Sequence, residues 1–326
     1  MDDDALIEGF LAGSPRALAR AISRSERGAG AAIVGSVYSR AGRALTLGLT
    51  GPPGVGKSTL CAGLVKGARE RGKTVGVVSV DPSSPFSHGA ILGDRIRLAE
   101  HFTDAGVFIR SMASRGHLGG LAGATGDAVA LMDAFGLNVV IVETVGVGQS
   151  EIEIAELADT TVVVLQPGSG DSVQLLKAGI LEIADVFVVN KADHPMALQL
   201  RREIRSMMEM LDFHGWVPSL VATRASEGAG IAELWEAIEA HAAYLRESGE
   251  LDAKRRSAFA HRVRELARGK IDAKLDAELA RTLGPEPLGD PYAAADRLLT
   301  AVAPAAREAT HSPVRALRLR STVKGL

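Results

Sequence analysis

Seven short runs of mostly apolar residues, separated by stretches with helical periodicity, constrain the fold of this chain more than any other feature. The runs are rich in β-branched residues, as is typical of strands buried on both faces of a parallel sheet. Strands that alternate with helices indicate a three-layer α/β domain with a mainly parallel sheet and right-handed crossovers. The expected strands are Leu45–Thr50, Val75–Val80, Val107–Arg110, Val139–Val142, Thr161–Leu165, Val186–Asn190 and Leu220–Thr223.

Helical segments flank this sheet domain on both sides. Before residue 44 the sequence predicts short helices, and Ser14-Pro15 is typical of a helix start, a capping side chain followed by a first-turn proline. Leu18 and Ile22 would share one face of that helix. We therefore divide the chain into an N-terminal helical extension (1–43), a sheet domain (44–248) and a C-terminal helical region that ends in a basic tail (249–326).

The longest uninterrupted helical pattern runs from Asp252 to Leu283, and Gly284-Pro285 is expected to end it. A helix of this length outside the sheet domain either packs against another chain or folds back on its own domain, and the sequence leaves both open. Its loose apolar stripe consists of Phe259, Val263, Leu266, Leu275 and Leu279.

Composition narrows the class of protein. The formal net charge of -2 gives no support to a nucleic-acid partner. Cys61 is the only cysteine, which excludes an intramolecular disulfide and a cysteine-rich zinc or iron–sulfur site. We expect Cys61 to be a small core residue. The first ten residues lack the apolar core of a signal peptide, and no apolar run is long enough to cross a bilayer. We expect a cytoplasmic protein with no membrane partner.

The first expected strand is followed by a glycine-rich segment, Gly51 to Thr59, that fits G-x-x-x-x-G-K-[ST] without a mismatch. Its glycines allow backbone N–H groups to turn toward phosphate oxygens, and the next helix directs its positive end at them. Lys57 can reach the β- and γ-phosphates, and Ser58 can offer its hydroxyl to Mg²⁺. The predicted phosphate site consists of Gly51, Gly54, Val55, Gly56, Lys57, Ser58 and Thr59.

The segment Asn190-Lys191-Ala192-Asp193, at the end of the sixth expected strand, distinguishes between nucleotide bases. Guanine presents N1–H and N2–H₂ donors on one edge, and the Asp193 carboxylate can accept both. Adenine lacks this pair of donors, so the segment favours GTP and GDP. Asn190 can hold the neighbouring loop and the base, and the stem of Lys191 can cover the ring. The backbone N–H of Ala225 is a further candidate for the guanine carbonyl.

Acidic residues near other strand ends are candidates for a Mg²⁺ site. Glu143 ends the fourth strand, where a P-loop protein places the carboxylate of its Mg²⁺ shell. Asp81 and Asp94 could serve the metal or position water, but a cap, a turn or a surface ion pair would also explain them. The N–H of Gly146 could contact the γ-phosphate in the GTP state alone, which is the basis of a molecular switch.

Together these segments resemble the MeaB/ArgK-type (MMAA-like) GTPases over about residues 1–305. The resemblance implies a homodimeric metallochaperone that hydrolyses GTP slowly until its partner accelerates the reaction. Such a chaperone gates adenosylcobalamin loading and protects a B12-dependent acyl-CoA mutase, usually methylmalonyl-CoA mutase, and an adenosyltransferase is a further expected partner. The matching segments are Gly51–Leu60, Val80–Phe86, Gly93–Arg95, Arg115–Leu121, Val142–Ser150 and Asn190–Asp193.

The same resemblance assigns roles to individual residues. It implies a mobile loop, Gln166 to Lys177, that communicates with the mutase and lets Lys177 reach toward the nucleotide. It also implies that the long C-terminal helix is a dimerisation arm. The residues expected to handle phosphate and Mg²⁺ are Lys57, Ser58, Asp81, Asp94 and Glu143.

One segment of that loop departs from the family pattern. The chain has Gly170-Asp171-Ser172-Val173-Gln174 where members that serve methylmalonyl-CoA mutase often have Gly-Asp-Glu-Leu-Gln. The client therefore stays open among mutases of methylmalonyl-, isobutyryl-, ethylmalonyl- and hydroxyisobutyryl-CoA.

Two other functions compete with the chaperone. A kinase would pass the γ-phosphate of GTP or ATP to a second molecule, as the older naming of the ArgK branch suggested, but no acceptor site is visible in the sequence. A nickel- or zinc-delivery GTPase would usually carry clusters of cysteine or histidine, and the single Cys61 argues against it.

Overall fold

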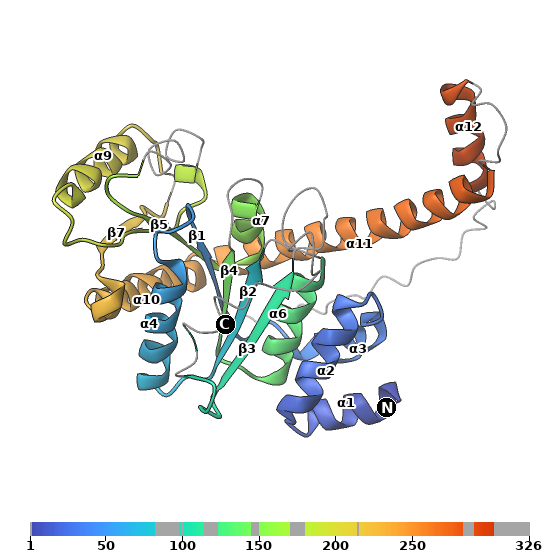
Figure 1. Ribbon diagram of the computed structural model, residues 1–326, viewed down its shortest axis with the longest axis horizontal. Coiled ribbons are helices and arrows are strands. Elements are labelled where there is room, and N and C mark those ends of the chain that lie inside the picture. Colours follow the sequence, from blue (N-terminus) through green and yellow to red (C-terminus); the bar gives the residue numbers. More distant parts are fainter. Residues whose placement is uncertain are drawn as a thin grey trace, which may run out of the picture. The chain divides into compact units, whose positions relative to one another are not determined.

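A seven-stranded parallel sheet lies at the centre of the part of the chain that the structure describes (Figure 1). The structure is a computed structural model, and it describes residues 2–81, 98, 101–113, 123–144, 150–169, 180–213, 215–282 and 290–302. The strand order is β3-β2-β4-β1-β5-β6-β7, and each neighbouring pair is parallel. The strands are β1 (Leu45–Thr50), β2 (Val75–Asp81), β3 (Val107–Ala113), β4 (Val139–Thr144), β5 (Thr160–Leu165), β6 (Val186–Val189) and β7 (Ser219–Ala222).

The α/β fold expected from the sequence is confirmed, because each predicted apolar run forms a strand. The largest difference is at β3, which continues past Arg110 to Ala113 through its parallel pairing with β2. Strands of this sheet lie between two layers of helices, so their side chains are apolar on both faces. All six residues of β4 and of β5 are buried.

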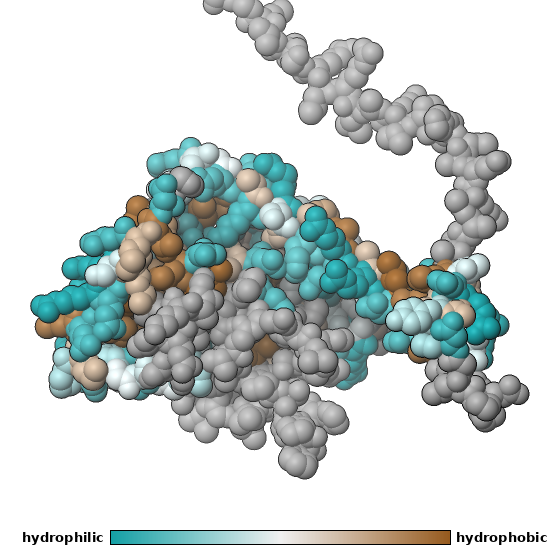
Figure 2. Space-filling view, turned by 90° about the horizontal axis from the view of Figure 1, so that it is seen from above, coloured by the Kyte–Doolittle hydropathy of each residue, from teal (hydrophilic) through white to brown (hydrophobic). Residues whose placement is uncertain are grey.

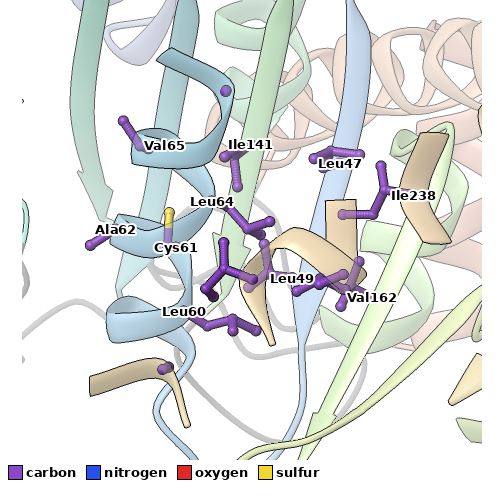
Figure 3. Close-up of a cluster of buried hydrophobic side chains, with 14 of the residues drawn as sticks. Leu47, Leu49, Leu60, Cys61, Ala62, Leu64, Val65, Ile141, Val162 and Ile238 are labelled. Atoms are coloured by element: carbon purple, nitrogen blue, oxygen red, sulfur yellow. The ribbon is translucent and has the colours of Figure 1, made fainter. Parts of the chain in front are cut away.

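One face of the sheet is covered by α4 (Lys57–Glu70) and α10 (Ile231–Glu247). Figure 3 shows their contact, where Leu60 and Leu64 of α4 and Ile238 of α10 meet Leu47 of β1 and Val162 of β5. One face of α10 is apolar and buried, with Ile231, Leu234, Trp235, Ile238, Ala242 and Leu245 all turned to the core. Cys61 also lies in this cluster, as expected for a core residue.

The opposite face is covered by α6 (Gly123–Phe135), α7 (Ser150–Leu157) and the N-terminal helices α1 (Asp3–Leu11), α2 (Pro15–Glu26) and α3 (Ala31–Val37). The helix start predicted at Ser14-Pro15 is confirmed, because the Ser14 hydroxyl accepts a hydrogen bond from the Ala17 N–H (3.4 Å). Leu18 and Ile22 are fully buried in the same cluster. A third apolar cluster lies between α9 (Ala197–Glu209) and strands β5 to β7.

The chain forms two compact units, Met1–Arg262 and Val263–Leu326. Helix α11 (Glu250–Thr282) belongs to both, and α12 (Pro291–Val302) belongs to the second. None of the α11 side chains is buried, and Figure 2 shows apolar residues among the hydrophilic ones on this part of the surface. The predicted domain limits and dimerisation role stay predictions, and Gly284-Pro285 lies outside the described residues. Within the described residues, no helix is long and apolar enough to span a membrane.

A buried histidine joins α10 to the amino-terminal ends of the strands. His241 is 1% exposed, its Nδ1 lies 2.9 Å from the Thr160 hydroxyl, and its Nε2 lies 3.3 Å from Asp185 Oδ1. The indole ring of Trp216 covers it at 4.9 Å between centroids. Burial lowers the pKa of His241 below its usual value, although the Asp185 carboxylate opposes that shift.

We predict that His241 makes the fold sensitive to mild acid. Because its native pKa is lowered, the unfolded chain binds the proton first as the pH falls. The stability that the neutral ring contributes is full above the ordinary pKa of about 6.5 and declines as the pH falls toward the native pKa. Urea unfolding at pH 7.5 and 5.5 measures the free energy of unfolding, and its decrease between these two pH values should be smaller in His241→Gln than in the wild type. The exposed His194→Gln variant should behave like the wild type, and an equal loss in all three proteins would contradict the assignment.

Candidate functional site

The predicted phosphate loop joins the carboxyl end of β1 to the start of α4, and its shape depends on glycine. Gly51 has a φ of 138°, and a Cβ there would lie 2.1 Å from the Val164 carbonyl oxygen. Gly56 has a φ of 94°, and a Cβ there would lie 2.5 Å from Asn190 Nδ2. Both the backbone conformation and the close neighbours therefore exclude larger residues. Gly54 also has a positive φ, Val55 is fully buried and Thr59 is half-buried.

Lys57 is the first residue of α4 and lies across the loop. Its side chain is buried, and its ammonium group donates hydrogen bonds to the carbonyl oxygens of Gly51 (2.6 Å) and Pro52 (2.8 Å). An ammonium group has three donors and rotates freely, so it can exchange a loop carbonyl for a phosphate oxygen without leaving the loop.

Ser58 and Glu143 meet at the carboxyl edge of the sheet, 85 residues apart in sequence. The Ser58 hydroxyl donates to Glu143 Oε1 at 2.6 Å, and both residues are buried, Glu143 at 0% exposure. A short hydrogen bond to a carboxylate leaves the serine lone pairs available for a cation. A hydroxyl beside a carboxylate is an oxygen donor set that fits Mg²⁺, which takes one or two protein ligands and completes its shell with phosphates and water. Their role in metal binding stays a prediction.

The other predicted metal and switch residues are only partly placed. Asp81 is the last residue of β2, and β2 is paired with β4 in the sheet. In this pairing Ser79 lies opposite Glu143, so Asp81 is two residues further along β2 than the partner of Glu143. Its side chain is outside the described part of the chain, as are Asp94, Gly146 and Lys177. Among the described residues, no group of three or more His, Cys, Asp or Glu side chains converges as a metal site would require.

Ser79 is a residue that sequence reasoning missed. As the register partner of Glu143 on the adjacent parallel strand, it lies on the same face of the sheet. Its side chain is 1% exposed, and its hydroxyl has no hydrogen-bond partner within the described residues. Such buried unpaired groups are uncommon and call for an explanation. The signal was a single polar residue within the apolar run Val75–Val80.

Asn190 connects three segments around the predicted base site. Its Nδ2 donates to the Val55 carbonyl of the phosphate loop (2.8 Å). Its Oδ1 accepts hydrogen bonds from the Thr223 hydroxyl (3.0 Å) and the Ala225 N–H (3.1 Å). Asn190 is 3% exposed, so these bonds are shielded from water. The structure thus places Asn190 as the holder of the neighbouring loops, while the predicted contact of the Ala225 N–H with guanine stays a prediction.

Lys191 and Asp193 lie at the surface beside this connection. Lys191 has a φ of 56°, which is unusual for a residue with a side chain and marks a constrained position. Its ammonium group reaches back to the carbonyl oxygen of Gly54 at 3.1 Å, so its stem spans from β6 to the phosphate loop. Asp193 is exposed, as a carboxylate that reads a base edge must be before the base binds. Their roles toward guanine stay predictions.

Comparison with known proteins identifies relatives along most of the chain. Residues 15–280 match the model of a family described as methylmalonyl Co-A mutase-associated GTPase MeaB. A protein of Pyrococcus horikoshii that is named as a GTPase is 47% identical over 307 residues, which are 91% of this chain and 97% of that protein. GTPase ArgK of Escherichia coli is 38% identical over 228 residues, 68% of this chain and 69% of its own length.

Two further matches carry other names. The Mus musculus protein named methylmalonic aciduria type A homolog, mitochondrial, is 39% identical over 223 residues, 66% of this chain and 54% of that protein. A crystal structure of a protein named LAO/AO transport system kinase superposes with a TM-score of 0.66 at 26% identity, covering 91% of this chain and 96% of that one.

We predict that Asn190→Ala destabilises the protein. The substitution leaves the Thr223 hydroxyl, the Ala225 N–H and the Val55 carbonyl buried without their partner, which should lower the free energy of unfolding by about 2–4 kcal/mol. Urea unfolding measures this change. Gln199→Ala, which removes an exposed amide that donates to Glu203, should stay within about 0.5 kcal/mol of the wild type. Equal stability of the two variants would contradict the connecting role.

A second prediction concerns the base. Xanthine carries a carbonyl where guanine carries its amino group, so an amide at position 193 pairs with xanthine and a carboxylate with guanine. Asp193→Asn should weaken GTP binding on the order of a hundredfold and strengthen XTP binding. Competition of both nucleotides against a fluorescent GDP measures the change. Glu227→Gln removes another exposed acid, one that pairs with Arg224, and should leave GTP affinity unchanged. An unchanged preference for GTP over XTP in Asp193→Asn would exclude Asp193 from recognition of the base.

Proposed function

Because this chain belongs to the MeaB family of GTPases and thus binds guanine nucleotide, we propose that it is a chaperone that couples GTP hydrolysis to the loading of adenosylcobalamin. In this proposal it gates delivery of the cofactor to a B12-dependent acyl-CoA mutase and protects that mutase from inactivation. The observation that carries the nucleotide part is the buried contact between Ser58 and Glu143 at the end of the phosphate loop. The mutase part is supported by the description of the matching family, which names association with methylmalonyl-CoA mutase.

The site would act by positioning and charge. The phosphate loop binds the β- and γ-phosphates through its N–H groups, and Lys57 shifts from the loop carbonyls to the phosphate oxygens. Ser58 and Glu143 hold Mg²⁺ together with Asp81 and Asp94. When bound, Mg²⁺ neutralises charge on the phosphates.

The remaining assignments concern the base and the switch. Asp193 and the Ala225 N–H read the base. Gly146 senses the γ-phosphate, and Lys177 reaches toward the nucleotide from the loop that communicates with the mutase. Hydrolysis is slow in the isolated protein and faster in the complex, because only the partner completes the site.

We also propose that the protein is a homodimer through its C-terminal helices. Within the described residues, α11 has no buried side chain and carries five large apolar residues that are at least 40% exposed. Burial of these side chains against a second copy would contribute about 25 cal/mol for each Å² of apolar surface removed from water. The apolar residues are Phe259, Val263, Leu266, Ile271 and Leu279.

The identity of the client stays part of the proposal. Methylmalonyl-CoA mutase is favoured by the family description and by the name of the mouse relative. The departure at Ser172-Val173 keeps a related acyl-CoA mutase in consideration. An adenosyltransferase that supplies the cofactor is the second partner, and we place the complex in the cytoplasm.

A kinase is the second candidate, and the name of the superposed crystal structure favours it. It would use the same phosphate loop but transfer the γ-phosphate to a protein or small molecule instead of water. Metal delivery is a weaker alternative, since the described residues contain no cluster of three metal-binding side chains and Cys61 is the only cysteine.

The test is GTP hydrolysis with and without each adenosylcobalamin-dependent mutase encoded beside this chain. One mutase should accelerate phosphate release by at least about tenfold, or 1.4 kcal/mol of barrier. Glu143→Gln should abolish the acceleration, whereas Glu236→Gln on the exposed face of α10 should keep it. Radiolabelled γ-phosphate on a second molecule would instead establish the kinase. Intact GTP binding without acceleration by any mutase would contradict the chaperone.

A further inference from the structure

A cavity of about 430 Å³ lies at the amino-terminal ends of β6 and β7, beside α10 and the first turn of α11. Asp185, directly before β6, and Pro218, directly before β7, both line it. It is therefore at the edge of the sheet away from the phosphate loop, which follows the carboxyl end of β1. Its volume is within the range of about 300–1,000 Å³ that is typical of small-molecule sites. The apolar part of its wall consists of Phe213, Trp216, Pro218 and Leu245.

Trp216 is the largest side chain of this wall, and its ring is held in place. Its indole N–H donates to the Asp185 carbonyl oxygen at 2.8 Å. The centroid of its ring lies 4.9 Å from that of His241 and 5.5 Å from that of Tyr244. A ring that is already fixed by a hydrogen bond and two ring contacts loses little further freedom when a ligand binds to it. The π face of an indole attracts cations more strongly than that of any other side chain.

One pair of charged residues in the cavity is neutralised within the protein. The ammonium group of Lys254 lies 3.2 Å from Asp185 Oδ2 and donates to the Asp159 carbonyl oxygen at 2.8 Å. The Asp185 carboxylate also accepts a hydrogen bond from the Thr161 N–H at 2.7 Å. Because each charge of this pair already has an opposite charge and further hydrogen bonds, neither needs a ligand.

Two further carboxylates line the cavity, and no cation among the described residues pairs with either of them. Glu182 is exposed and forms no hydrogen bond or ion pair within the described part of the chain. Glu250, the first residue of α11, is also exposed and accepts a hydrogen bond from the Tyr244 hydroxyl, which leaves its negative charge in place. The cavity is therefore reachable from solvent, and its described lining carries more negative than positive charge.

We propose that this cavity binds an organic cation, an ammonium or guanidinium group on a short apolar stem. Glu182 and Glu250 attract the charge, and Trp216 and Leu245 contact the stem. An anion would instead meet two carboxylates that no cation neutralises. Free amines and the lysine or arginine side chains of a partner protein both carry the proposed group. Because the cavity lies at the amino edge of the sheet, the inference does not rest on the proposed function.

The test is heteronuclear NMR of the full-length protein at constant ionic strength, because the indole N–H of Trp216 reports directly on the cavity. The chain has two tryptophans, and the Trp216→Phe variant identifies their signals. The cation n-butylammonium should shift the Trp216 signal with half-saturation on the order of 1–10 mM, as expected for one ring and two exposed carboxylates. The signal of Trp235, which is fully buried and donates to the Leu64 carbonyl oxygen, should not move. The alcohol n-butanol, which has the same stem without the charge, should give no saturable shift.

Variants that remove charge test the chemistry of the ligand. Glu182→Gln should raise the half-saturation concentration by about threefold, and Glu182→Gln/Glu250→Gln by about tenfold, because each amide keeps the shape of the side chain and removes its charge. Glu236→Gln removes an exposed acid of α10 that does not line the cavity and should leave this concentration unchanged. The absence of a saturable shift in the wild type, an equal shift with n-butanol, or equal affinity in the double variant would each overturn the proposal.

Two further probes distinguish a free amine from a protein side chain. N-acetyl-lysine methylamide presents the ammonium group as it occurs within a chain, and putrescine presents an ammonium group at each end of one short stem. Tighter binding of the blocked lysine than of n-butylammonium would assign the cavity to a partner protein, and tighter binding of putrescine would assign it to a free diamine. If neither probe shifts the Trp216 signal, the proposal is wrong, since each carries the proposed group.

Discussion

The parallel pairing of β1 with β4 is the constraint on which the site depends. It places the loop after β1 and Glu143 of β4 at the same edge of the sheet, so that Ser58 and Glu143 meet at 2.6 Å although they are 85 residues apart. Antiparallel pairing would send the two strand ends to opposite edges. Every role proposed for the site, from holding phosphate to holding Mg²⁺, starts from this convergence of strand ends.

A second layer of contacts keeps the loops in place. Asn190 binds the phosphate loop on one side and the loop after β7 on the other, and Lys191 spans back to Gly54. Because the bonds of Asn190 are buried, a shift of any of these loops costs hydrogen bonds that solvent cannot readily replace. The proposed base site and the proposed phosphate site are therefore held in a common geometry before a ligand arrives, which would lower the entropy cost of binding.

Much of this fold was predictable because local sequence and tertiary structure agree. Runs such as Val139–Val142 have no polar face, so they fit only a strand covered on both sides, and Ser14-Pro15 defines a helix start by local chemistry. The phosphate loop was predictable because its sequence matches a motif whose glycines take a positive φ in the turn between β1 and α4. Ser79 was not predicted, because its position beside Glu143 follows only from the register between β2 and β4.

Long-range pairs explain what the sequence could not reveal. Arg255 with Asp159 and Arg262 with Asp127 join segments that no local pattern links, and the long helix was consistent with two arrangements. The family resemblance supplied the client and the dimer, which are properties of surfaces and partners. Such properties leave no periodic signature within one chain, and they stay proposals here.

The central claim is that Ser58 and Glu143 form the metal-holding pair of a guanine-nucleotide site. Calorimetric titration of the full-length protein with a slowly hydrolysed GTP analogue, with Mg²⁺ and then with a chelator, tests it most directly. The account predicts that Mg²⁺ tightens binding in the wild type by about tenfold or more, and by less than about twofold in Ser58→Ala. Binding that is equally tight with and without Mg²⁺ in the wild type, or no binding of a guanine nucleotide at all, would contradict it.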